Sequence, residues 1–181
     1  MVTARKAAVL FPGVRYSVDT PLLYYAGTTF AQRGYEVFSV DYGDEAKSLH
    51  DLDRAVDALE GPVLKQLRSW KLEQHEDVVF VSKSIGTVLA GRCAQGLNCN
   101  VRQIFLTPLE LTLPWLNRST DVAVGAGADP FLDAERLQAH CEAHGVPLTM
   151  YPGVGHRLED KGDIRRTLAI LGEIVELYER F

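Results

Sequence analysis

The sequence has little of what marks several classes of protein. It contains only three cysteines, with no CxxC pair, so we expect packed free thiols and neither a disulfide framework nor a cysteine metal site. No apolar run approaches the roughly 18 residues that a membrane span needs. The net charge is −5 and no cluster of Lys and Arg is present, which argues against nucleic acid as a partner. These absences favour a protein that works in the cytoplasm, away from membranes.

The length of 181 residues suits one compact unit, and no linker, repeat or low-complexity stretch divides it. We therefore expect a single domain over residues 1–181. The first residues run directly into the apolar stretch 7–11, which is too short for a secretory signal and reads as a first strand.

Short apolar runs alternate with longer segments of helical period, a pattern typical of an α/β protein. We expect a doubly wound, mostly parallel six-stranded sheet with helices on both faces. The predicted strands are residues 7–11, 36–40, 78–82, 103–106, 122–125 and 148–151.

Helix signals fill the gaps between these strands. Thr20-Pro21 predicts the start of a first helix and Gly34 its end. The segment 52–70 has helical period but is expected to break at Gly61-Pro62. Further helices are predicted over 85–94 and 134–144. The last helix is expected to bury one stripe: Ile164, Leu168, Leu171, Val175 and Tyr178.

In the common strand order 2-1-3-4-5, the winding reverses between the first and third strands, and the ligand crevice lies there. The loops to examine are residues 12–20 and 82–86. The second of these belongs to the segment Ser82-Lys83-Ser84-Ile85-Gly86, in which a strand turns at once into a helix with a serine at the tip. A nucleophile elbow needs small residues two before and two after its strained serine. Ser82 stands where a glycine is usual, and Lys83 receives no role.

With this segment, the chain resembles the α/β-hydrolase superfamily, in the small form without a lid, and the resemblance extends from the Phe11-Pro12-Gly13 loop to the last helix. The stretch Gly125 to Phe131 is similar to the family's acid loop, and Tyr151 to His156 is similar to its histidine loop. The resemblance implies a catalytic triad of Ser84, Asp129 and His156, each at the end of a strand. Glu110 remains the alternative acid.

The resemblance also implies the chemistry. His156 is expected to act as general base, Asp129 to orient it, and the backbone amides of Val14 and Ile85 to form an oxyanion hole. The segment 107–121 is too short for a lid of several helices. We therefore expect an open pocket for a small-molecule acyl substrate, edged by residues that include Tyr16, Leu22 and Trp115.

Other functional interpretations of the sequence are weaker. His140 and His144 lie four apart, but the glutamate of a metalloprotease signature does not follow His140, so no metal is expected. The glycines near Gly125 follow the fifth strand, with Asp129 close by, so they do not predict a dinucleotide site, and no cofactor is expected. A non-enzymatic binding module on the same fold remains the alternative. The sequence leaves open the oligomeric state and the choice among ester, thioester, amide and carbon-carbon bonds.

Overall fold

The computed structural model describes residues 5–43 and 52–181, and it forms one six-stranded parallel sheet. The strand order is β2-β1-β3-β4-β5-β6, so the winding reverses between β1 and β3 as predicted. Residues 1–4, which precede the predicted first strand, lie outside the described residues. The strands are β1 Lys6–Phe11, β2 Glu36–Ser39, β3 Asp77–Lys83, β4 Val101–Leu106, β5 Val122–Ala126 and β6 Leu148–Tyr151.

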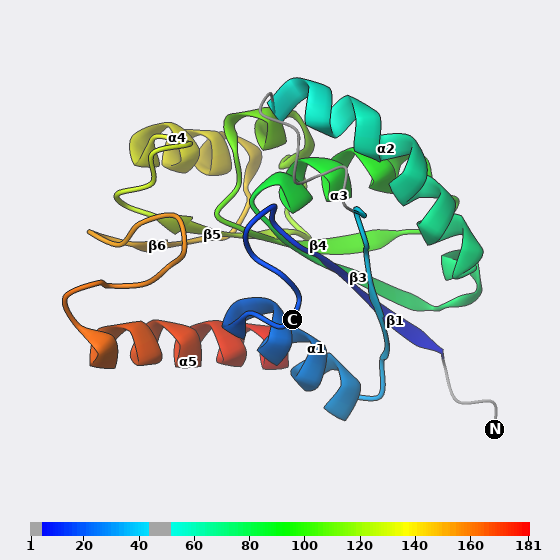
Figure 1. The fold of residues 1–181 in the computed structure, drawn as a ribbon, viewed down its shortest axis with the longest axis horizontal. Helices are drawn as coiled ribbons and strands as arrows, with labels where there is room; N and C mark the ends of the chain where they lie inside the picture. Colours follow the sequence, from blue (N-terminus) through cyan, green and yellow to red (C-terminus); the bar gives the residue numbers. More distant parts are fainter. Residues whose placement is uncertain (1–4, 44–51) are drawn as a thin grey trace.

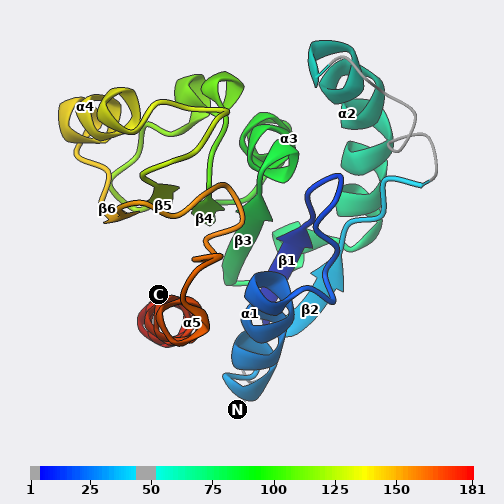
Figure 2. The same ribbon diagram turned by 60° about the vertical axis from the view of Figure 1, so that its left-hand side comes forward.

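Helices cover both faces of the sheet (Figure 1). The helix α1 (Pro21–Gln32) and the helix α5 (Ile164–Arg180) lie side by side on one face, as Figure 2 also shows. The other face carries α2 (Leu52–Ser69), α3 (Ile85–Gln95) and α4 (Ala134–His144). The described residues also contain two short 3₁₀ helices, η2 (Leu72–Gln74) and η3 (Glu110–Trp115). Within the described residues, no helix combines the length and hydrophobicity that crossing a membrane requires.

Burial on both faces explains why the strands are almost continuously apolar. In β1, Ala7, Val9 and Phe11 pack in the cluster that contains residues of α2 and α3. Ala8 and Leu10 point the other way, into the cluster formed with α1 and α5. A strand with two buried faces has no solvent side on which polar residues would alternate. The doubly wound α/β fold predicted from the sequence is therefore confirmed.

The predicted helix break at Gly61-Pro62 is wrong. Helix α2 runs without interruption through Pro62, and Ala55, Val56, Leu59, Val63 and Leu67 are its buried residues. A proline inside a helix removes one hydrogen bond and costs about 3 kcal/mol. Each of these apolar side chains contributes about 1.5–3 kcal/mol when fully buried. Keeping one continuous apolar stripe against α3 therefore outweighs the cost of Pro62.

The predicted stripe on the last helix is only partly buried. The buried residues of α5 are Ile170, Ile174 and Tyr178, whereas Ile164 is 69% exposed and Leu168 59% exposed. The segment contains two sets of apolar residues with helical spacing, the predicted stripe and the set Ile170, Ile174 and Tyr178, and Tyr178 belongs to both. The sheet and α1 cover the series that contains Ile170, so the first two members of the predicted stripe remain at the surface.

Candidate active site

The turn between β3 and α3 has the strained geometry that a nucleophile elbow requires. Ser84 has φ 58° and ψ −124°, a conformation that non-glycine residues rarely adopt. The following turn is crowded, because a β-carbon on Gly86 would lie 2.5 Å from the carbonyl oxygen of Phe11 and 2.7 Å from that of Pro12. The helix start is thus pressed onto the end of β1, and Ser84 lies against the loop that follows β1.

The serine at position 82, where a glycine is usual, is accommodated by a hydrogen bond. Ser82 is fully buried in β3, and its Oγ donates to the carbonyl oxygen of Ile104, 3.2 Å away in the neighbouring strand β4. A buried hydroxyl without a partner would be costly. The serine that replaces the usual glycine is therefore buried without leaving its hydroxyl unpaired.

The structure brings together the three side chains predicted to form a triad. The Nε2 atom of His156 lies 2.8 Å from Oγ of Ser84, and Nδ1 lies 2.7 Å from Oδ2 of Asp129. An ionised carboxylate only accepts hydrogen bonds, so Nδ1 carries the proton and Nε2 is left to accept from the serine hydroxyl. The Asp129 side chain is 4% exposed, whereas Ser84 is partly exposed. The base is thus oriented from the interior and the hydroxyl is reachable from outside.

Neighbouring residues hold the carboxylate and the imidazole in place. The other carboxylate oxygen of Asp129 accepts from the backbone amide of Phe131 at 2.9 Å. The exposed ring of Phe131 packs edge-on against the imidazole of His156, with ring centroids 4.7 Å apart. The acid loop therefore contacts the base through both a charged and an aromatic side chain.

The alternative acid is engaged elsewhere. Glu110 forms a two-point ion pair with the guanidinium of Arg136, with 2.7 and 2.8 Å between Nε and the two carboxylate oxygens. Asp133, which competes with Asp129 for the cap of α4, does cap that helix by accepting from the amide of Arg136. Of the two candidate acids, Asp129 is the one that contacts His156.

The two predicted oxyanion donors flank the serine. Ile85 is the first residue of α3, and Val14 follows Gly13, whose β-position would lie 3.3 Å from the Ser84 β-carbon. Gly13 and Tyr16 exchange backbone hydrogen bonds, which fold the loop back on itself. The amides of Val14 and Ile85 donate to no acceptor within residues 5–43 and 52–181. Both amides thus remain available to a ligand.

Lys83, for which the sequence predicts no role, is buried and contacts the backbone of the triad histidine. Its Nζ donates to Oγ1 of Thr107 at 2.5 Å and to the backbone carbonyl of His156 at 2.8 Å. It also lies 5.2 Å from the centre of the Tyr16 ring. Burial lowers the pKa of Lys83 to about 7, a shift that the nearby charge of Asp129 opposes. Burial therefore disfavours the charged form of Lys83, and the carboxylate of Asp129 offsets part of that cost.

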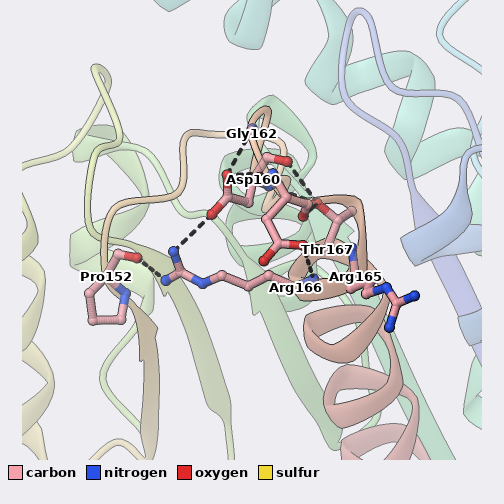
Figure 3. Close-up of polar contacts among 7 residues, drawn as sticks. Pro152, Asp160, Gly162, Arg165, Arg166 and Thr167 are labelled. Atoms are coloured by element: carbon pink, nitrogen blue, oxygen red, sulfur yellow. Dashed lines mark hydrogen bonds and ion pairs between the residues drawn. The ribbon is translucent and has the colours of Figure 1, made fainter.

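Arg166 is a second basic residue that holds the histidine loop, as Figure 3 shows. The guanidinium of Arg166, in the first turn of α5, donates to Oδ2 of Asp160 at 2.9 Å and to the carbonyl oxygen of Pro152. These acceptors lie on either side of His156 in the chain. The pKa of Asp160 is lowered mainly by the hydrogen bond from the backbone amide of Gly162 and next by that from the Arg166 side chain. Arg166 thus joins the beginning and end of the loop that carries the base.

The residues expected to edge a substrate pocket fall into two groups. Tyr16 and Leu22 are buried together, the amide of Leu22 donating to the Tyr16 hydroxyl at 3.0 Å, and both line a cavity of about 560 Å³. Burial raises the pKa of Tyr16 to about 12. Trp115 instead packs against Gly91, two turns along α3, and lines a separate cavity of about 170 Å³ beside α2. The structure therefore separates Trp115 from the other two.

The pair His140 and His144 shows no metal geometry. Their rings stack with centroids 4.3 Å apart, and each makes a hydrogen bond to a backbone carbonyl oxygen, that of Leu116 for His140 and that of His140 for His144. In the part of the chain that the structure describes, no group of three or more His, Cys, Asp and Glu could hold a metal ion.

The geometry defines a class of protein: a doubly wound parallel sheet with a Ser-His-Asp arrangement at the carboxyl ends of its strands. No protein-family model matches the sequence, and no curated protein matches it. Solved structures do match.

Three of these structures are similar over nearly the whole chain. Esterase 2 of Thermogutta terrifontis is 18% identical with a TM-score of 0.68, covering 98% of this chain and 82% of its own. An α/β serine hydrolase without a lid from Xanthomonas campestris is 16% identical with a TM-score of 0.67, covering 99% and 84%. An α/β serine hydrolase homologue from Coxiella burnetii is 14% identical with a TM-score of 0.67, covering 97% and 84%. The chain has the α/β-hydrolase fold, in its form without a lid.

Proposed function

We propose that this protein is a serine hydrolase that cleaves an ester or related acyl bond of a small molecule. The observation that carries the proposal is the continuous chain of hydrogen bonds from Ser84 through His156 to Asp129. A serine hydroxyl is a weak nucleophile near neutral pH unless a base removes its proton as it attacks. The solved structures with this fold include an esterase and serine hydrolases, which agrees with the proposal.

The order of proton transfers follows from the two hydrogen bonds of His156, one to Ser84 and one to Asp129. Nε2 of His156 accepts the hydroxyl proton while Oγ of Ser84 attacks the acyl carbon, and the imidazolium then donates that proton to the leaving group. Asp129 stabilises the imidazolium without taking its proton. Water attacks the resulting acyl-enzyme by the same sequence, and the acid and free Ser84 are released.

The tetrahedral intermediate needs donors aimed at its oxyanion. We assign this role to the amides of Val14 and Ile85, of which the second is at the positive end of the α3 dipole. One such donor is typically worth about 10²–10³ in turnover. Because η3 is the only helix in the fully described segment between β4 and β5, no lid of several helices is inserted there, and we propose a small or exposed acyl group as substrate.

A fluorophosphonate probe tests the nucleophile. We expect the probe to label the wild-type protein at Ser84, with the modified residue mapped by mass spectrometry, and to leave Ser84→Ala unlabelled. Equal labelling of both proteins would refute the proposal. Absence of labelling, together with no turnover of p-nitrophenyl esters from acetate to octanoate, would instead favour a binding module on the same fold.

A matched pair of substitutions tests the acid. Asp129→Asn is expected to lower turnover by about 10⁴-fold, because the asparagine amide favours the wrong tautomer of His156. Glu110→Gln is the control, since it also neutralises one carboxylate beside the site but disturbs only the ion pair with Arg136. It is expected to keep wild-type turnover. If Glu110→Gln were the more damaging change, the assignment of Asp129 would be wrong.

A further inference from the structure

The proposed mechanism makes no use of Lys83, although this residue directly precedes the nucleophile. Its side chain is 1% exposed, and it is the only lysine of the described residues that is fully buried. Both hydrogen-bond acceptors of its ammonium lie far away in the chain: Thr107 at the end of β4 and the backbone carbonyl of His156. Burying a cation is costly, and removing such a cation leaves its buried acceptors without a donor.

We propose that Lys83 is a positioning residue, which holds the backbone of His156 at a fixed distance from Ser84. The expected effect of Lys83 on turnover rests on the proposed function, whereas its effect on the position of His156 does not. Lys83 is the last residue of β3 and Ser84 follows it, so the nucleophile and the support of the base are attached to the same rigid strand. Thr107, which directly follows the neighbouring strand β4, accepts a hydrogen bond from the ammonium.

The histidine loop needs such a support because it has no regular structure. His156 lies between the end of β6 and the start of α5, and Gly153, at φ 73°, lies three residues before it. No hydrogen bond within residues 5–43 and 52–181 other than that from Lys83 reaches the carbonyl oxygen of His156. A misplacement of about 1 Å in a catalytic group costs up to about 10²-fold in rate.

The groups that face the ammonium agree with a supporting role. The Tyr16 ring lies on one side, and the guanidinium of Arg157, which follows His156 in the chain, lies 5.1 Å from the centre of that ring. The carboxylates of Asp129 and Glu159 balance these two cations. Lys83 therefore connects the loop after β1, the elbow and the histidine loop, and it offsets the charge of the triad acid.

The test compares Lys83→Met with Lys65→Met. The second substitution removes the same charge from an exposed position on α2, outside the lining of the cavity at Tyr16, so it is the matched control. We expect Lys83→Met to lower kcat for p-nitrophenyl acetate by about 10- to 100-fold with KM within about three-fold, because substrate binding is not disturbed. Lys65→Met is expected to leave both constants unchanged. Thr107→Val removes one acceptor but keeps the bond to His156, so its effect on kcat is expected to be smaller.

A second readout does not depend on turnover. The proton on Nδ1 of His156, in its short bond to Asp129, is expected to give a low-field ¹H NMR resonance that Asp129→Asn abolishes. We expect this resonance to shift or broaden in Lys83→Met and to be unchanged in Lys65→Met. If Lys83→Met does not fold, Lys83→Gln is measured in the same way, with the same expected direction.

The possible outcomes separate the two proposals. Turnover within about two-fold of wild type and an unchanged resonance in Lys83→Met would overturn the role of Lys83 while leaving the hydrolase intact. No turnover and no probe labelling in the wild-type protein would refute the hydrolase. In that case the resonance in Lys83→Met still decides whether Lys83 positions His156.

Discussion

The loop that carries His156 is held by two basic side chains, Lys83 and Arg166, which differ in burial. The inner anchor, Lys83, is inaccessible to solvent and bonds to the backbone of His156 itself. The outer anchor, Arg166, is 41% exposed and bonds to Pro152 and Asp160, on either side of the histidine. An exposed ion pair is worth about 0–1 kcal/mol because water competes for both partners. The comparison teaches that two anchors with similar numbers of hydrogen bonds need not contribute equally.

The largest difference between the anchors is expected in the pH dependence of stability. The pKa of Lys83 is about 7 in the folded chain, against a usual value of 10.5. Between these values the unfolded chain binds more protons, so the free energy of unfolding rises with pH, by a few kcal/mol in total. Lys83→Met lacks this rise. Urea unfolding of both proteins at pH 7 and pH 10 measures it, and parallel changes in the two proteins would contradict it.

A smaller effect is expected from removing the outer anchor. Arg166→Met breaks the bonds to Asp160 and Pro152, and we expect it to lower the free energy of unfolding by about 0.5–1 kcal/mol. The inner anchor remains, so kcat is expected to stay within about three-fold of wild type. Urea unfolding at neutral pH and the ester assay check both values. A loss of turnover as large as that of Lys83→Met would reverse the ranking of the two anchors.

The smallest effect concerns the outer anchor in acid. The pKa of Asp160 is lowered below its usual 3.8, so its ionised form stabilises the fold above that value and the stabilisation is lost as the pH falls through the folded pKa. Asp160→Asn is therefore expected to melt slightly below wild type at pH 6, and the gap is expected to narrow at pH 3. Calorimetry at the two pH values tests this, and a gap as large at pH 3 as at pH 6 would show another origin.

The sequence predicted those features of the site that depend on local order along the chain. The strand, turn and helix around Ser84 are contiguous, and Asp129 and His156 each follow a strand whose carboxyl end must lie on the same side of a parallel sheet. The role of Lys83 was not predictable in this way. Its partners are Thr107 and His156, 24 and 73 residues away, and only folding brings them together. The one signal available was a lysine at the end of a strand with no charged residue between Asp77 and itself.

The errors have a common physical origin. From the sequence, Pro62 predicts a break in the helix, but the apolar side chains that α2 packs against α3 keep the helix continuous. Leu168 fits a helical stripe, yet the sheet and α1 cover the neighbouring series that includes Ile174. In both cases packing between distant elements chose among local possibilities that the sequence alone left nearly equal.

The backbone of Ser84 has a consequence for how this protein tolerates change. At φ 58° and ψ −124° a β-carbon is unfavourable, and a glycine would relieve the strain. Replacing Ser84 by glycine would thus stabilise the fold and at the same time remove the hydroxyl that is the proposed nucleophile. Stability and the proposed function therefore make opposite demands on this position, and selection for stability alone would favour the loss of the serine.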